Sequence, residues 1–237
     1  MNWLKRPFDF ESGAILNFHK PKGRSSFWVV KQIKKLVAVK VGHSGTLDPF
    51  AEGVLLLCTG RATKKVAELM DLPKTYIGEI ELGFTTDTDD VTGNMLTKSS
   101  VQETRIEEIE RVCKSFIGDI YQLLPMFSAK KIKGRRLYKL ARAGETIDRE
   151  PSLVHIESLD LLSFKLPIIK IKVQCSKGTY IRSLARDIGE KIGCGGYLKS
   201  LVRTKIGAYK IEDSLTLEKF DQILRSANVV SDEIIDK

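Results

Sequence analysis

The stretch that decides the fold spans residues 153–175 and reads LVHIESLDLLSFKLPIIKIKVQC. It contains two apolar segments, 153–164 and 168–175, with Lys-Leu-Pro between them. The second segment interleaves β-branched residues with lysine, which favours a strand, and a proline interrupts strand pairing. The sequence therefore predicts two consecutive, paired strands and a β-sheet as the centre of the fold.

Two periodic patterns flank this pair of strands. Residues 76–84 alternate between apolar and polar side chains, which is the period of a strand. After the pair, apolar residues recur at helical spacing from Ile181 to Ile192, and Gly193 follows as a typical helix end. We therefore expect a strand before the pair and a helix after it.

The other predicted elements are of both kinds. A helix that Ser25 or Ser26 can cap is predicted from the apolar spacing of residues 27–37, and it turns its lysines outward and buries four apolar side chains. These four are Phe27, Val30, Ile33 and Val37. A short helix over 196–201 and a strand over 206–211 are expected later in the chain. Because strands and helices mix without regular β–α–β alternation, we predict an α+β fold with a mixed, mainly antiparallel central sheet flanked by helices.

The charge balance favours a polyanionic partner. Lysine and arginine number 39 against 30 aspartate and glutamate, giving a formal charge of +9 and a pI of about 9.3. This suits nucleic acid, although a basic protein without any nucleic-acid role has the same balance. The longest apolar run, Val54 to Cys58, is much shorter than the roughly 20 residues of a membrane span. With no apolar secretory signal either, the expected location is cytoplasmic.

The four cysteines do not indicate a metal site. Cys58, Cys113, Cys175 and Cys194 lie far apart, with no Cys-x-x-Cys pair and no histidine at metal-ligand spacing. We therefore expect reduced thiols and no bound metal.

The segment from His43 to Gly53, HSGTLDPFAEG, concentrates polar side chains in a predicted loop between a helix and a buried strand. Loops positioned by rigid elements are common places for catalysis. However, Asp-Pro also starts turns, and a loop histidine is often only hydrogen-bonded. Spacing alone therefore leaves both a structural and a catalytic role open for Asp48 and for His43.

The segment 130–142, KKIKGRRLYKLAR, contains seven basic residues and no acid. A solvated surface usually mixes both signs, so this run favours contact with a phosphate backbone, with a merely solvated face as the alternative. The predicted backbone-binding residues are Lys130, Lys131, Arg135, Arg136 and Arg142.

Arg182 and Tyr76 are two further candidates. Arg182 lies where a predicted strand is followed by the start of a helix, which suits binding of an anion or carboxylate but also an ordinary surface ion pair. Tyr76 opens its strand after Lys74-Thr75, where both core packing and stacking on a base are possible.

Four separate segments resemble the motifs of one enzyme family. His43-Ser44-Gly45-Thr46-Leu47-Asp48-Pro49 resembles the signature loop of the TruB family of tRNA pseudouridine synthases, whose aspartate is the catalytic residue. Three other segments are similar to further family motifs and occur in the same order. They are Lys20-Pro21-Lys22-Gly23, Lys74-Thr75-Tyr76 and Ser176-Lys177-Gly178-Thr179-Tyr180-Ile181-Arg182. The resemblance covers residues 13–220.

This resemblance implies an activity and a set of site residues. The reaction would be isomerisation of uridine to pseudouridine at position 55 in the T-loop of tRNA, by base flipping and without a metal or organic cofactor. The implied catalytic residues, expected to meet in one cleft, are Asp48, Tyr76 and Arg182. The implied substrate-binding residues are Lys20, His43, Tyr180 and Leu201.

The resemblance also implies a domain layout and a partner. We expect an N-terminal extension over 1–12, a catalytic domain over 13–220 and an acidic tail over 221–237, with no PUA domain. The expected partner is the T-arm of tRNA, bound by a monomer that needs no membrane, guide RNA or obligate protein partner. A guide-dependent synthase of the Cbf5 type and a non-catalytic RNA-binding protein on the same fold are the alternatives.

Three positions depart from the usual pattern of the family. His19 stands where an aspartate is common, Gly195-Gly196-Tyr197 where Gly-Ala-His is usual, and Val202 where a second arginine often precedes Arg203. These positions flank the expected RNA surface, so they bear on RNA binding rather than on the reaction.

Overall fold

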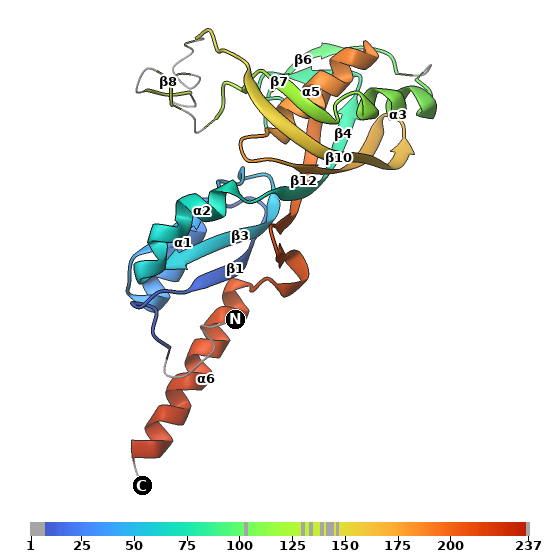
Figure 1. Cartoon of the computed structure of the whole chain (residues 1–237). Helices are drawn as coiled ribbons and strands as arrows, with labels where there is room; N and C mark the ends of the chain where they lie inside the picture. Colours follow the sequence, from blue (N-terminus) through green and yellow to red (C-terminus); the bar gives the residue numbers. More distant parts are fainter. Residues whose placement is uncertain are drawn as a thin grey trace. The chain divides into compact units, whose positions relative to one another are not determined.

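The computed structural model describes residues 8–101, 104–128, 131–132, 135–137, 140, 145 and 147–235. The chain divides into two compact units. Met1–Leu72 together with Arg203–Lys237 form unit 1, and Pro73–Val202 form unit 2. Figure 1 labels many of the helices and strands of each unit.

Unit 1 combines antiparallel strands with helices. Strand β3 pairs antiparallel with both β1 and β2, with Lys20 opposite Gly53 and Ser44 opposite Leu56. The elements of this unit are β1 (Ile15–Lys20), α1 (Ser26–Val37), β2 (Val41–Ser44), β3 (Glu52–Thr59), η2 (Gly60–Lys65), α2 (Val66–Asp71), β13 (Tyr209–Lys210), η3 (Ile211–Asp213) and α6 (Leu217–Ile235).

The main core of unit 1 joins the first and last parts of the chain. Phe220 of α6 packs edge to face on Phe18 of β1, with ring centroids 5.3 Å apart, and Leu215 lies in the same cluster. Apolar side chains of α1 and β3 complete this core. Residues 221–235, which the sequence assigns to an acidic tail, continue helix α6.

Helix α1 begins where the sequence predicts, but it buries a different stripe. Ser25 caps the helix by accepting a hydrogen bond from the Trp28 amide. The buried residues are Ser26, Val29, Val30, Ile33 and Val37. Phe27, predicted to lie in the core, is instead 60% exposed. This prediction was wrong because Ser26 occupies the inward position of the first turn, where it makes hydrogen bonds to the loop before β3.

Unit 2 is built on a sheet with the strand order β12-β4-β11-β10-β7, in which β4–β11, β11–β10 and β10–β7 are antiparallel. The predicted strand pair 153–164 and 168–175 is confirmed as β10 and β11. The elements are β4 (Lys74–Leu82), β5 (Phe84–Thr86), β6 (Met95–Lys98), α3 (Ile106–Lys114), β7 (Gly118–Gln122), β8 (Lys131–Ile132), β9 (Arg135–Arg136), β10 (Ser152–Lys165), β11 (Ile168–Cys175), α5 (Ile181–Ile192) and β12 (Gly196–Ile206), which continues into unit 1. The predicted α+β class is confirmed.

Helix α5 is confirmed, but the helix predicted over 196–201 is wrong. Gly193 ends α5 with a left-handed backbone (φ 91°), and strand β12 begins three residues later. The start of β12 lies directly against α5: a Cβ on Gly189 would be 2.3 Å from the carbonyl carbon of Gly195. This close approach of two backbones is possible only with glycine, and no apolar pattern in the sequence indicates it.

Candidate active site

The Asp48 loop, residues 45–51, connects β2 to β3 in unit 1. The predicted polar loop is shorter than expected because residues 41–44, including His43, form β2. Asp48 is half-buried, while its neighbours Leu47 and Phe50 are buried. The Ala51 amide donates a hydrogen bond to the Asp48 carbonyl at 3.1 Å, so the Asp-Pro segment does form a turn. Its buried neighbours hold this turn in place on both sides of the carboxylate.

Helix α1 binds the residue that precedes Asp48. The Ser26 hydroxyl accepts a hydrogen bond from the Leu47 amide at 2.9 Å and donates one to the Leu47 carbonyl at 3.1 Å. Both polar groups of one loop residue are therefore satisfied by one buried side chain, which fixes the loop to the first turn of the helix.

Lys20 binds backbone oxygens around the same loop. Its side chain is completely buried, and its ammonium group donates to the carbonyls of Pro21 (3.0 Å), Arg24 (2.5 Å) and Pro49 (3.5 Å). Burial lowers the pKa of Lys20 to about 8, and the negative charge of Asp48 opposes this shift. The structure thus places this predicted substrate-binding residue in contact with the loop backbone.

Arg203, which sequence reasoning did not select, binds the loop from strand β12. Its guanidinium group is buried and donates to the carbonyls of Val54 (2.7 Å), Gly45 (3.2 Å) and Thr46 (3.5 Å). The only sequence signal was its place after Val202, where the family often has an arginine pair. Gly53 (φ 110°) packs on the Arg203 backbone so closely that a Cβ there would be 2.3 Å from the Arg203 oxygen.

His43 lies on β2 in a setting that favours its neutral form. Burial, and then the positive charge of Arg203, lower the pKa of His43. Its buried Nδ1 atom has no hydrogen-bond partner among the described residues. A neutral ring of this kind can stack on a flat group without a cost for burying charge.

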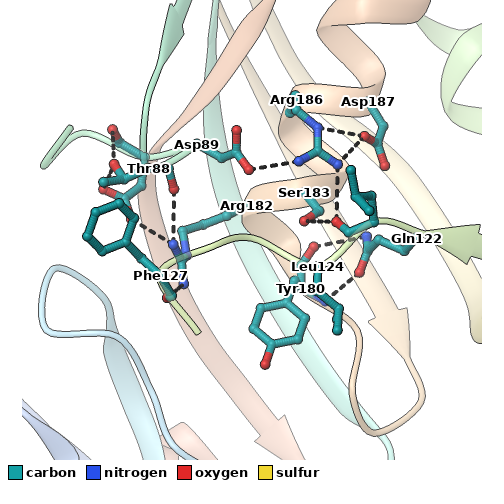
Figure 2. Close-up of polar contacts among 12 residues, drawn as sticks. Thr88, Asp89, Gln122, Leu124, Phe127, Tyr180, Arg182, Ser183, Arg186 and Asp187 are labelled. Atoms are coloured by element: carbon teal, nitrogen blue, oxygen red, sulfur yellow. Dashed lines mark hydrogen bonds and ion pairs between the residues drawn. The ribbon is translucent and has the colours of Figure 1, made fainter. Parts of the chain in front are cut away.

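In unit 2, Arg182 is held at the start of α5 (Figure 2). Its side chain is 3% exposed and donates to the carbonyls of Thr88 (3.0 Å) and Phe127 (2.8 Å). It also pairs with the buried carboxylate of Asp90 at 3.4 Å. These partners fix the direction of the guanidinium plane. Thr88 and Asp90 lie between β5 and β6, and Phe127 lies in the segment after β7.

The other unit 2 candidates lie on the sheet and at the first turn of α5. The backbone amide of Tyr180 donates a hydrogen bond to the side-chain oxygen of the buried Gln122 at 2.8 Å. The side-chain amide of Gln122 donates one back to the Tyr180 carbonyl at 3.0 Å (Figure 2). Tyr76 lies on β4, opposite Val173. Leu201 on β12 lies 3.6 Å from where a Cβ on Gly78 would be, so this glycine leaves room for it.

Arg186, one helical turn after Arg182, reinforces this part of the site. It pairs with Asp89 at 2.9 Å and with Asp187 at 2.8 Å (Figure 2). Since Asp89 is next to Asp90, α5 is bound to the same turn through two arginines.

Comparison with known protein families shows which family the chain belongs to. Residues 32–181 match the model described as TruB family pseudouridylate synthase (N terminal domain). The chain belongs to the TruB family. Residues 182–236 match the model described as tRNA pseudouridylate synthase B C-terminal domain.

Two individual relatives of this TruB-family chain agree with the family assignment. It is 46% identical to a tRNA pseudouridine synthase B of Francisella philomiragia, across 94% of this chain and 76% of the relative. It is 42% identical to a tRNA pseudouridine synthase B of Bacteroides fragilis, across 93% of this chain and 98% of the relative.

Solved structures show the same fold in longer chains. A Cbf5-Nop10-Gar1 complex matches with a TM-score of 0.71 and 28% identity, covering 90% of this chain and 54% of the solved one. An H/ACA RNP bound to a substrate RNA containing 2'-deoxyuridine matches with a TM-score of 0.67 and 27% identity, covering 90% and 53%. The TruB-family chain thus spans about half the length of these solved chains.

The predicted basic run of this TruB-family chain stays a prediction. Lys130 and Arg142 lie outside the described residues, and for Lys131, Arg135 and Arg136 only the backbone is described, as the short antiparallel pair β8–β9. Among the residues that the structure describes, no cluster of three or more His, Cys, Asp or Glu side chains suits a metal ion. No helix in that part of the chain is long and apolar enough to cross a membrane.

Proposed function

We propose that this chain isomerises uridine to pseudouridine in the T-loop of tRNA, at the position conventionally numbered 55, with Asp48 as the reacting carboxylate. The observation that carries the proposal is the Asp48 loop of a TruB-family chain, bound on both sides by the buried side chains of Ser26, Lys20 and Arg203. A loop held in this way presents a carboxylate in one fixed geometry, which is what a reaction at one glycosidic bond requires.

The substrate base must first leave its stack, at a cost of a few kcal/mol. We assign three side chains to this step. Tyr76 stacks on the flipped uracil, Leu201 forms an apolar wall beside it, and the neutral His43 ring stacks near the place that the base has left. The hydrogen-bonded Tyr180 positions the base or Asp48.

The chemical step needs Asp48 as an anion. The bond between C1′ of the ribose and N1 of uracil breaks, the ring rotates, and a bond from C1′ to C5 of uracil forms. C5 then loses its proton, and the freed N1 gains one. Asp48 attacks the uracil ring or the ribose, or assists a glycal route, and Tyr76 can move a proton. Because atoms and electrons balance within the nucleotide, the reaction calls for no redox cofactor.

We assign Arg182 the role of keeping Asp48 ionised and oriented. The partners of Arg182 support this role, because an arginine bound by Asp90 and two carbonyls cannot rotate freely. Asp90 and Thr88 therefore act as positioning residues for Arg182.

An unmodified tRNA transcript incubated with the purified protein alone tests the proposal. Chemical mapping should find pseudouridine at position 55, and Asp48→Asn should abolish it while folding and most of the tRNA affinity remain. Product at another position would reject the site assignment. Product only after a guide RNA is added would favour the Cbf5-type alternative, and near-normal turnover by Asp48→Asn would remove Asp48 from the chemistry.

A further inference from the structure

One face of α1 and the turn before it carries exposed cations of a single sign. We call it the α1 cationic face, and it consists of Arg24, Phe27, Trp28, Lys31, Lys34 and Lys35. The helix contains no acidic residue, and Lys34 and Lys35 lie in its last turn. Within the described part of the chain, none of the three lysines pairs with a carboxylate. No carboxylate of the described residues therefore neutralises these lysines.

Two aromatic rings hold two of these cations in place. The Lys31 ammonium lies 5.3 Å from the centroid of the exposed Phe27 ring, and the Arg24 guanidinium lies 5.0 Å from that of Trp28. A long cationic side chain normally loses rotamer freedom when it binds an anion. Cation–π contacts restrict that freedom beforehand, so less is lost on binding. This gives the exposed Phe27 a role that core packing does not.

The α1 cationic face begins at the Asp48 loop. The Gly23 amide donates to the Pro49 carbonyl at 2.7 Å, and Lys20 donates to the carbonyls of both Arg24 and Pro49. At roughly 1.5 Å per residue, the face then runs about 16 Å from Arg24 to Lys35. A strand that presents one nucleotide to Asp48 therefore has the start of this face beside its next nucleotides.

We propose that the α1 cationic face binds the phosphates of the RNA strand that flanks the target uridine. The inference rests on the proposed function and adds to it a second RNA-binding surface, on an element separate from the 130–142 run. RNA is the partner that fits, because the face offers several cations that no carboxylate of the described residues pairs with, and it contains no acid, whereas protein interfaces usually mix charge signs or bury apolar side chains. The Phe27 and Trp28 rings restrict the side chains of Lys31 and Arg24, and the RNA phosphates neutralise the positive charges of the face.

The test is the salt dependence of binding to an unmodified T-arm RNA. The triple variant Lys31→Gln/Lys34→Gln/Lys35→Gln removes three charges from exposed positions. The control Lys114→Gln/Lys165→Gln/Lys172→Gln removes three charges from exposed lysines of unit 2. If all three α1 lysines contact phosphates, the slope of log K against log salt should fall by roughly 2 to 3 in the first variant. In the control variant the slope should stay close to that of the wild type.

A third variant isolates the aromatic contribution. Phe27→Leu keeps every charge and most of the apolar volume, so it should weaken binding severalfold without changing the slope. Equal slopes for the two triple variants would overturn the proposal. Pseudouridine formation by the wild-type protein, measured in parallel, separates the two hypotheses: product with equal slopes rejects only the surface, whereas absence of product rejects the proposed function.

Discussion

Two buried cations bind the backbone on either side of Asp48. Lys20 donates a hydrogen bond to the carbonyl of Pro49, and Arg203 donates to those of Gly45 and Thr46. These hydrogen bonds are partly buried and have a charged donor, so each cation stabilises the loop conformation that presents the carboxylate. Sequence reasoning selected Lys20 but not its partners, and missed Arg203. The reason is that every residue has a carbonyl, so an acceptor 158 residues away leaves no local trace in the sequence.

Replacing Arg203 should change the titration of His43. In Arg203→Met the pKa of His43 should rise, because the cation that lowers it is gone, whereas Arg203→Lys should shift it less. NMR titration of the histidine rings measures this, with the half-exposed His155 in unit 2 as an internal reference. The rate should fall in both variants through the loosened loop. A His43 titration identical to wild type in Arg203→Met would show that Arg203 does not act on this region.

Lys20 should make stability depend on pH in the alkaline range. Its pKa falls from 10.5 in an unfolded chain to about 8 in the folded one, so the unfolded state binds the proton more tightly. The free energy of unfolding should therefore rise, relative to Lys20→Met, as the pH increases from 8 to 10.5, by up to about 3 kcal/mol. Urea unfolding of both proteins across this range tests the sign. A constant difference between them would mean that Lys20 titrates normally.

At the scale of elements, the periodic segments were predictable and the junction after α5 was not. The β10–β11 pair and helix α5 follow from strand and helix periods in the sequence. Strand β12 was predicted in part as a helix, because the contact of Gly189 in α5 with Gly195 and Gly196 is one that no hydrophobic pattern encodes. The apolar pattern also misplaced Phe27 in the core. Ser26 takes the inward position because it makes hydrogen bonds there, and a hydrophobic pattern does not show these bonds.

This junction gives a stability prediction. Gly189→Ala places a Cβ 2.3 Å from backbone atoms of Gly195 and Gly196, so the helix and strand must separate. We expect a loss of roughly 1–3 kcal/mol in the free energy of unfolding, and more if β12 detaches. Thermal unfolding measures it. Gly193→Asn is the control, because nothing lies within 4 Å of a Cβ there and asparagine tolerates its left-handed backbone. Equal melting temperatures for the two variants would contradict the close contact.

At the scale of the whole molecule, the candidate residues divide between the two units. Lys20, His43 and Asp48 belong to unit 1, and Tyr76, Tyr180, Arg182 and Leu201 belong to unit 2. Motif resemblance selected all seven, although no local pattern in the chain relates the first group to the second. Their convergence on one substrate therefore stays a prediction, and kinetics can test it.

Asp48→Glu and Arg182→Lys should each lower kcat by about 100-fold, because each shifts a reacting or orienting group by about an ångström. If both residues serve the same step, the double variant should lose much less than the product of the two factors. Single-turnover measurements on a tRNA transcript give the three rates. Losses that multiply would indicate that the two residues act independently.

Unit 1 consists of the first and last segments of the chain, and this sets the order in which it can be completed during synthesis. The ribosome releases β1, α1, β2 and the Asp48 loop first, and then all of unit 2, before Arg203, Leu215 and Phe220 emerge. Until then, the nascent loop lacks one of its two cations and part of the core beneath it. A nascent chain that stops before residue 203 would contain every residue assigned to the chemical step. The loop that carries its reactive carboxylate would still lack the hydrogen bonds of Arg203 and the core contacts of Leu215 and Phe220.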